Sequence, residues 1–176
     1  MQAVLSLFVC LITASVALKG KGNNLRWINE FDQNLNFQCV NDESISMITS
    51  VHENKHEDRR WAFRCKKTFS NSGNCNWSGY INNFDEEFEF TCPFGSVLNG
   101  MSSYHDNKKE DRRWNFLCCL GEVQVVKKCK WSDYVNEFDE YLSWEAPTNH
   151  YLVGASSYHN NKREDRRWRY HSCEKN

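Results

Sequence analysis

The chain has 176 residues, among them 7 Trp, 7 Tyr and 11 Phe, and this aromatic content excludes an intrinsically disordered protein. Its 22 basic and 23 acidic residues nearly cancel, which argues against a nucleic-acid-binding protein because such proteins carry a basic excess. The length fits one domain, or a few small modules that share one core.

The first segment is apolar. Residues 5–18 form the only long apolar run, which is shorter than the roughly 20 residues that span a bilayer. Ser15 and Ala17 have the spacing of a signal-peptidase site. We therefore interpret residues 1–17 as a signal peptide, the alternative being a short buried helix. The mature chain, residues 18–176, is expected to be secreted to the extracellular space or matrix, without a transmembrane segment.

The rest of the chain repeats three times. Each repeat closes with the motif Asp-Arg-Arg-Trp, and the tryptophans of this motif, Trp61, Trp114 and Trp168, are 53 and 54 residues apart. A Phe-Asp pair stands 30 residues before each of them. This regular spacing indicates three homologous repeats of about 54 residues, at about residues 26–66, 75–119 and 129–173.

Within each repeat the pattern is that of β-strands. Residues 35–39, 88–92 and 142–146 alternate apolar and polar side chains, which is typical of a strand with one buried face. No segment of helical length shows a capped period of 3.6 residues. The sequence therefore predicts an all-β, single disulfide-stapled domain that is pseudo-threefold and resembles a β-prism or β-trefoil.

The repeat register also predicts the disulfides. Cys10 leaves with the signal peptide, so eight of the nine cysteines remain. One cysteine pair, 26 residues apart, is present in the first two repeats and lost as a pair from the third. Another pair, 44 residues apart, is lost as a pair from the first repeat. We therefore predict Cys39–Cys65, Cys75–Cys119, Cys92–Cys118 and Cys129–Cys173.

The charged closing motif has two interpretations. In the structural one, Asp and the first Arg form a clasp that fixes the turn, while Trp fills the core. The residues of this motif are Asp58, Arg59, Trp61, Asp111, Arg112, Trp114, Asp165, Arg166 and Trp168.

In the second interpretation the loop binds sulfated or acidic glycans, because a guanidinium group holds sulfate or carboxylate with two hydrogen bonds. Three linked sites would give avidity. The candidate ligand-binding residues are His52, Asn54, Arg60, His105, Asn107, Arg113, His159, Asn161 and Arg167.

Two further sequence motifs occur in the chain. Residues 52–56 match HExxH, but the other repeats keep neither its glutamate nor its second histidine, and a strand follows, so we reject a zinc protease. No nucleophile elbow, P-loop or dinucleotide motif occurs, and we expect no enzyme activity, cofactor or metal. Asn76-Trp77-Ser78 is the only N-glycosylation sequon, which makes Asn76 a candidate site of modification.

The repeated Asp-Arg-Arg-Trp motif, the W-x-x-Y-x-N-x-F-D opening and the cysteine framework resemble the dermatopontin family over about residues 26–173. The longer form H-x-N-x-x-E-D-R-R-W is most similar to the haemolymph members of that family, which agglutinate cells. The resemblance implies a secreted extracellular-matrix protein that binds proteoglycans and supports cell adhesion.

These observations lead to two hypotheses. The first is a non-enzymatic, lectin-like adhesion protein that aggregates cells or bridges matrix glycans and proteoglycans through repeated sites. The alternative is a structural protein of matrix assembly without glycan specificity, whose partners are matrix proteins. The sequence leaves open whether the chain forms a homo-oligomer.

Overall fold

The computed structural model describes residues 26–176, so the expected signal peptide lies outside the described residues. Eleven strands and no helix form within this range, which confirms the all-β prediction. The strands are β1 (Leu35–Gln38), β2 (Glu43–Glu53), β3 (Asp58–Lys67), β4 (Ser72–Tyr80), β5 (Phe88–Thr91), β6 (Val97–Asp106), β7 (Asp111–Gly121), β8 (Val125–Trp131), β9 (Leu142–Glu145), β10 (His150–Asn160) and β11 (Asp165–Lys175). No helix that could cross a membrane occurs among the described residues.

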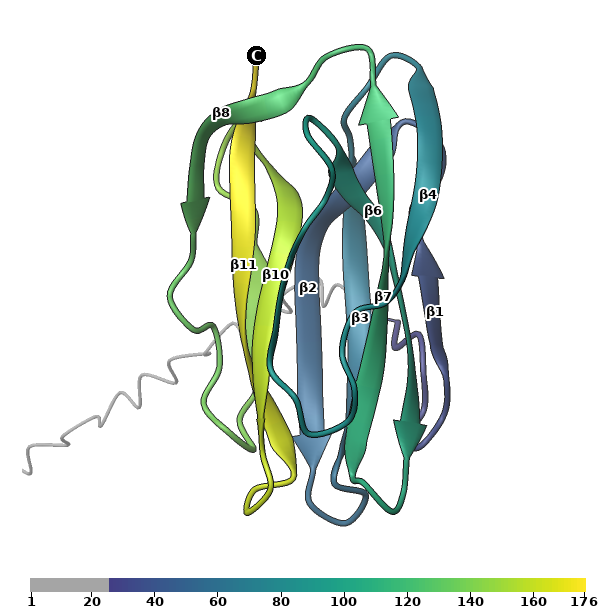
Figure 1. Cartoon of the computed structure of the whole chain (residues 1–176), viewed down its shortest axis with the longest axis vertical. Helices are drawn as coiled ribbons and strands as arrows, with labels where there is room; N and C mark the ends of the chain where they lie inside the picture. The colour runs from purple at the N-terminus through teal and green to yellow at the C-terminus, as the bar shows by residue number, and fades with distance from the viewer. Residues whose placement is uncertain (1–25) are drawn as a thin grey trace, which may run out of the picture.

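Three antiparallel hairpins form the body of the molecule. They are β2–β3, β6–β7 and β10–β11, one from each sequence repeat. Figure 1 shows these hairpins running along the long axis, with their turns at the end opposite to the C-terminus. The three Glu-Asp-Arg-Arg sequences therefore come together at one end.

A short strand from another repeat extends each hairpin into a sheet. β1 of the first repeat pairs with β6 of the second, β5 of the second with β10 of the third, and β9 of the third with β2 of the first. The three sheets have the orders β1-β6-β7-β4, β5-β10-β11-β8 and β3-β2-β9. Because these pairings close a ring, no repeat completes its own sheet.

The core lies between the three sheets. Trp61, Trp114 and Trp168 are at most 1% exposed and meet edge to face, with ring centroids 4.7–5.2 Å apart. Aromatic rings prefer this edge-to-face arrangement, which places the positive edge of one ring against the negative face of the next. The prediction that these tryptophans fill the core is therefore correct.

Four disulfides staple the sheets, and they are the four pairs that the repeat register predicts: Cys39–Cys65, Cys75–Cys119, Cys92–Cys118 and Cys129–Cys173. The neighbouring residues Cys118 and Cys119 alternate along β7 and so bond to partners on opposite faces of the strand. Closed loops of 26 and 44 residues restrict the unfolded chain, which stabilises the fold by about 3–4 kcal/mol each.

Candidate functional site

The three hairpin turns carry a glutamate with an unusual backbone. Glu57, Glu110 and Glu164 have φ angles of 45°, 45° and 44°, in the left-handed region that favours glycine. Each glutamate directly precedes the Asp-Arg-Arg sequence that starts the second strand of its hairpin. This strained turn therefore recurs at the same position in every repeat.

The Asp and the first Arg of each motif are buried, and they bind across repeats. Each Arg donates two hydrogen bonds of 2.6–2.7 Å, from Nε and Nη2, to both carboxylate oxygens of an Asp in another repeat. The three pairs are Arg59–Asp165, Arg112–Asp58 and Arg166–Asp111. In each pair the side chains are only 4% and 2% exposed. The predicted clasp thus joins repeats instead of fixing one turn.

The Phe-Asp pairs supply a second contact to this ring. Asp32 has a φ of 62°, and its backbone N–H donates to Oδ2 of Asp58 over 2.8 Å. Asp85 and Asp139 repeat this geometry towards the other buried aspartates. An additional carbonyl group accepts from Nη2 of each arginine, so both charged partners have several hydrogen bonds. These hydrogen bonds offset much of the cost of burying the pairs, although Nη1 of Arg59 and of Arg166 has no hydrogen-bond partner among the described residues.

The predicted ligand-binding histidines lie inside the molecule. The side chains of His52, His105 and His159 are each only 1% exposed. In each repeat Nδ1 is hydrogen-bonded over 3.1 Å to the asparagine two residues later. The histidines therefore do not reach a ligand in solution. The prediction that they bind a ligand is corrected, because their buried side chains contact other repeats instead.

Each histidine lies between two carboxylates. Nδ1 of His105 is 3.7 Å from Asp32 of the first repeat, and its Nε2 is 3.9 Å from Glu110. His52 and His159 have equivalent neighbours, Asp139 with Glu57 and Asp85 with Glu164. Nε2 of each ring has no hydrogen-bond partner among the described residues.

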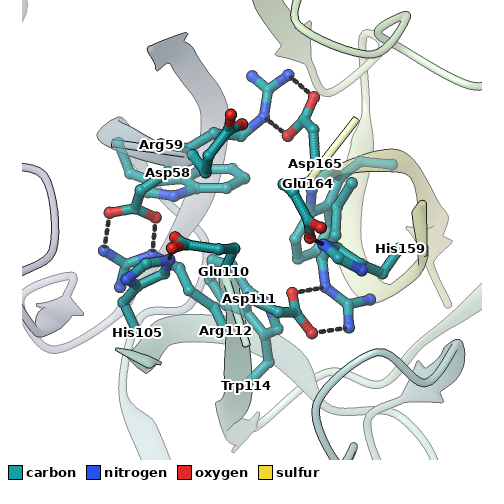
Figure 2. A pocket seen from close by; sticks show the side chains of 14 residues that line it. Asp58, Arg59, His105, Glu110, Asp111, Arg112, Trp114, His159, Glu164 and Asp165 are labelled. Carbon is teal, nitrogen blue, oxygen red and sulfur yellow. Dashed lines mark hydrogen bonds and ion pairs between the residues drawn. The ribbon is translucent and has the colours of Figure 1, made fainter. Parts of the chain in front are cut away.

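A small cavity lies inside this ring of side chains, as Figure 2 shows. Its volume of about 20 Å³ has room for a group the size of a water molecule, not for a sugar ring. Burial raises the pKa of Glu110 and Glu164, and neighbouring carboxylates raise the pKa of both further, while His105 and His159 oppose the change. The ring is thus a structural junction of the repeats.

Three groups in this junction have the composition of a metal site. One comprises Asp32, Asp58 and His105, whose potential ligand atoms lie within 4.8 Å of one another, and the other two are its equivalents. The buried aspartate of each group is already neutralised by an arginine, so the guanidinium group takes the place that a metal cation would have. The two histidines of the rejected HExxH match do not share a ligand set, because His56 contacts Asp32 while His52 contacts Glu57.

The second arginine of each motif lies on the outer surface instead. Arg60, Arg113 and Arg167 pack their guanidinium groups over aromatic rings at the opening of their own repeat, a cation–π arrangement. The contacts are Arg60 over Trp27 (5.3 Å) and Phe31 (4.8 Å), Arg113 over Tyr80 (5.2 Å), and Arg167 over Tyr134 (4.7 Å) and Phe138 (6.0 Å). We call these three groups the Arg–aromatic clusters.

The Arg–aromatic clusters are partly open to solvent: the arginine side chains of the first and third repeats are 29% and 22% exposed. Tyr80 is 47% and Tyr134 is 41% exposed. In the third repeat Arg169 adds a second guanidinium, 5.0 Å from the ring of Trp131 and 2.8 Å from Glu89. A surface cavity of about 350 Å³ lies beside Tyr134 and Arg169.

One set of buried polar residues was given no role in the sequence analysis, although its asparagine stands in the W-x-x-Y-x-N-x-F-D opening. Asn29, Asn82 and Asn136 are each 5% exposed. Each side chain donates to the carbonyl group of the first Arg and accepts from the backbone N–H of the Trp in its repeat. Their spacing of 32 residues before each Trp was a usable signal.

One protein-family model matches most of the chain. The family model described as Dermatopontin matches residues 29–176. The chain belongs to the dermatopontin family.

Several relatives cover most of the chain. A hemagglutinin/amebocyte aggregation factor from Limulus polyphemus is 43% identical over 84% of this chain and 86% of its own length. Millepora cytotoxin-1 from Millepora dichotoma is 39% identical over 83% of this chain and 65% of its own length. A dermatopontin from Biomphalaria glabrata is 37% identical over 84% of this chain and 99% of its own length. None of these names is that of an enzyme. No solved structure matches the chain.

Proposed function

We propose that this chain is a secreted, non-enzymatic adhesion protein that aggregates cells or bridges matrix glycans through its three Arg–aromatic clusters. The single observation that carries this proposal is the recurrence of a half-buried arginine on an aromatic ring at the same position of every repeat. The family relationship supports it, as does the name of the Limulus relative, an aggregation factor.

The chemistry of the clusters suits sugars. An exposed aromatic face packs against the apolar face of a sugar ring, while a guanidinium donates to hydroxyl, carboxylate or sulfate oxygens. The competing carboxylates, Glu30 beside Arg60 and Glu137 beside Arg167, are 75% and 71% exposed. Because these carboxylates are exposed to solvent, the ion pairs contribute little free energy, and a ligand displaces the carboxylates at low cost.

We also infer a pseudo-threefold arrangement of the β-prism or β-trefoil kind, within one domain of three repeats. The closed ring of strand pairings and the three equivalent Arg–Asp pairs support it. A single molecule would then present three sites, and three linked weak sites bind a surface through avidity. The acidic and basic residues of the chain nearly cancel, which is consistent with recognition through short-range contacts of the clusters.

Cell agglutination by the purified, oxidised protein tests the proposal. Neutral, acidic and sulfated glycans would be added as competitors, with and without EDTA. We expect agglutination that at least one glycan class inhibits. Arg60→Gln, Arg113→Gln and Arg167→Gln together should lower the agglutination titre by at least about tenfold, because avidity is lost.

Arg163→Gln is the matched control. Arg163 is 62% exposed, lies in the turn of the third repeat and pairs with Asp139, but it contacts no aromatic ring of the clusters. It should agglutinate like the unmodified protein. If the triple variant folds and agglutinates normally, the clusters are not the sites.

The second candidate function is structural matrix assembly, which the Biomphalaria dermatopontin relative favours. Absence of agglutination, together with binding to immobilised collagen or proteoglycan core protein that no glycan inhibits, would establish this alternative.

A further inference from the structure

The second repeat carries an apolar groove that the Arg–aromatic clusters do not use. It has a volume of about 510 Å³ and lies between β4, the end of β7 and the segment after β5. Phe94, Trp77 and Leu120 line it and are 73%, 40% and 39% exposed. Exposed apolar surface of this kind on a secreted domain normally has an occupant.

The groove is peculiar to this repeat. At the positions of Phe94 and Leu120, the first repeat has Asn41 and Lys67, and the third has Thr148 and Glu174. Homologous positions on the same fold thus tolerate polar residues, so folding does not require the apolar ones. Their presence in the second repeat calls for a separate reason.

The sequon lies in the same groove. Asn76, Trp77 and Ser78 all line it, and Asn76 is exposed on β4, opposite Cys118 of β7. The third repeat has Lys130 in place of Asn76, and thus lacks both the apolar pair and the sequon. We propose that Asn76 carries an N-linked glycan whose first sugars pack over Trp77, Phe94 and Leu120. The inference rests on the secretion that the proposed function includes.

The chemistry of the groove favours this occupant. Its lining contains no charged side chain, which suits the uncharged inner sugars of an N-linked glycan. The apolar faces of these sugars contact aromatic and aliphatic side chains, while their hydroxyl groups remain in water. A charged ligand would find no partner in the groove.

The position on the sheet gives the glycan a second effect. β4 is an outer strand of the sheet β1-β6-β7-β4, and outer strands with free backbone groups can pair with another chain. A bulky, solubilising glycan at Asn76 blocks this pairing. A glycan and a second copy docked on the groove exclude each other.

The first measurement uses the full chain secreted from insect cells into the medium. Intact mass and peptide mass spectrometry, before and after peptide N-glycosidase F, should show a glycan on Asn76 and its conversion to Asp on release. Protein recovered from the medium with Asn76 unmodified would overturn the proposal. If the unmodified protein forms dimers or binds vesicles, the occupant of the groove is a second copy of the chain or a lipid surface.

The second measurement asks whether the glycan covers the groove. Enzymatic removal from the folded protein should raise the fluorescence of an apolar dye severalfold. Asn76→Gln should bind the dye like the deglycosylated protein. Asn74→Gln changes a groove residue outside the sequon and should bind the dye like the original glycosylated protein. Adding Phe94→Thr and Leu120→Glu, the residues of the third repeat, to Asn76→Gln should abolish the extra dye binding.

If the glycan is present but its removal leaves dye binding unchanged, the packing is wrong. Agglutination is measured separately on the same samples. Its loss or persistence bears on the Arg–aromatic clusters, so failure of one proposal is distinguishable from failure of the other.

Discussion

Arg112 and Asp58, which are 54 residues apart and belong to different repeats, share two hydrogen bonds of 2.6 Å inside the protein. The pair is one of three that close a ring through the repeats. Removing one partner of a buried ion pair leaves a charge that neither water nor protein compensates.

Asp58→Asn should therefore lower the free energy of unfolding by about 3–5 kcal/mol, measured by urea denaturation. Asp111→Asn and Asp165→Asn should have similar effects, because their partners and burial are equivalent. Arg163→Gln, which breaks an exposed ion pair, should cost less than about 1 kcal/mol. Equal effects of Asp58→Asn and Arg163→Gln would contradict the buried ring.

The disulfides should be reduced in a fixed order. Cys75 and Cys129 are exposed, whereas Cys92 and Cys118 are 5% and 6% exposed. Because an attacking thiolate must reach a sulfur atom, Cys75–Cys119 and Cys129–Cys173 should open first and Cys92–Cys118 last. Limited reduction, alkylation and peptide mass spectrometry would follow the order, and early loss of Cys92–Cys118 would refute it.

The stability of the hairpin turns should depend on pH through Glu110. Its pKa is raised, chiefly by burial, so ionisation costs more in the folded than in the unfolded state. This penalty is present above the folded pKa and is relieved as the pH falls through it. Glu110→Gln should therefore raise the melting temperature at neutral pH and have no such effect below the ordinary pKa of 4.5.

Glu122 provides a comparison of opposite sign. The backbone N–H groups of Ser70 and Asn71 donate to its carboxylate and lower its pKa. Its stabilising contribution is present above the unfolded pKa and is lost as the pH falls through the folded pKa. Glu122→Gln should lower the melting temperature at neutral pH. If Glu110→Gln and Glu122→Gln change the melting temperature in the same direction, the environments of these two glutamates are misassigned.

Gly154 tests the pairing of β5 with β10 across repeats. A Cβ atom on Gly154 would lie 2.4 Å from the carbonyl oxygen of Phe90, a backbone atom of the neighbouring strand. Gly154→Ala should cost about 1–3 kcal/mol in urea denaturation, as overpacking typically does. Gly79→Ala gives the comparison, because nothing lies within 4 Å of its Cβ and only its φ of 78° is strained. Unchanged stability of Gly154→Ala would argue against this pairing.

Local regularities made part of this structure readable from the sequence. The spacing of Trp61, Trp114 and Trp168 gave the repeats, alternation gave the strands, and joint loss of cysteines gave the disulfide pairs. Each of these signals depends on the order of residues along one chain, since period and register are properties of the sequence itself.

Partners across repeats were decided by the tertiary structure alone. Each repeat carries the same Asp, Arg and His, so the sequence cannot distinguish a contact within a repeat from one between repeats. Packing the three hairpins around the tryptophans sends Arg112 to Asp58, buries His105 beside Asp32 and leaves Arg113 on Tyr80 at the surface. The sequence by itself therefore determined which residues recur, and only their packing decided which of them form buried junctions and which lie at the surface.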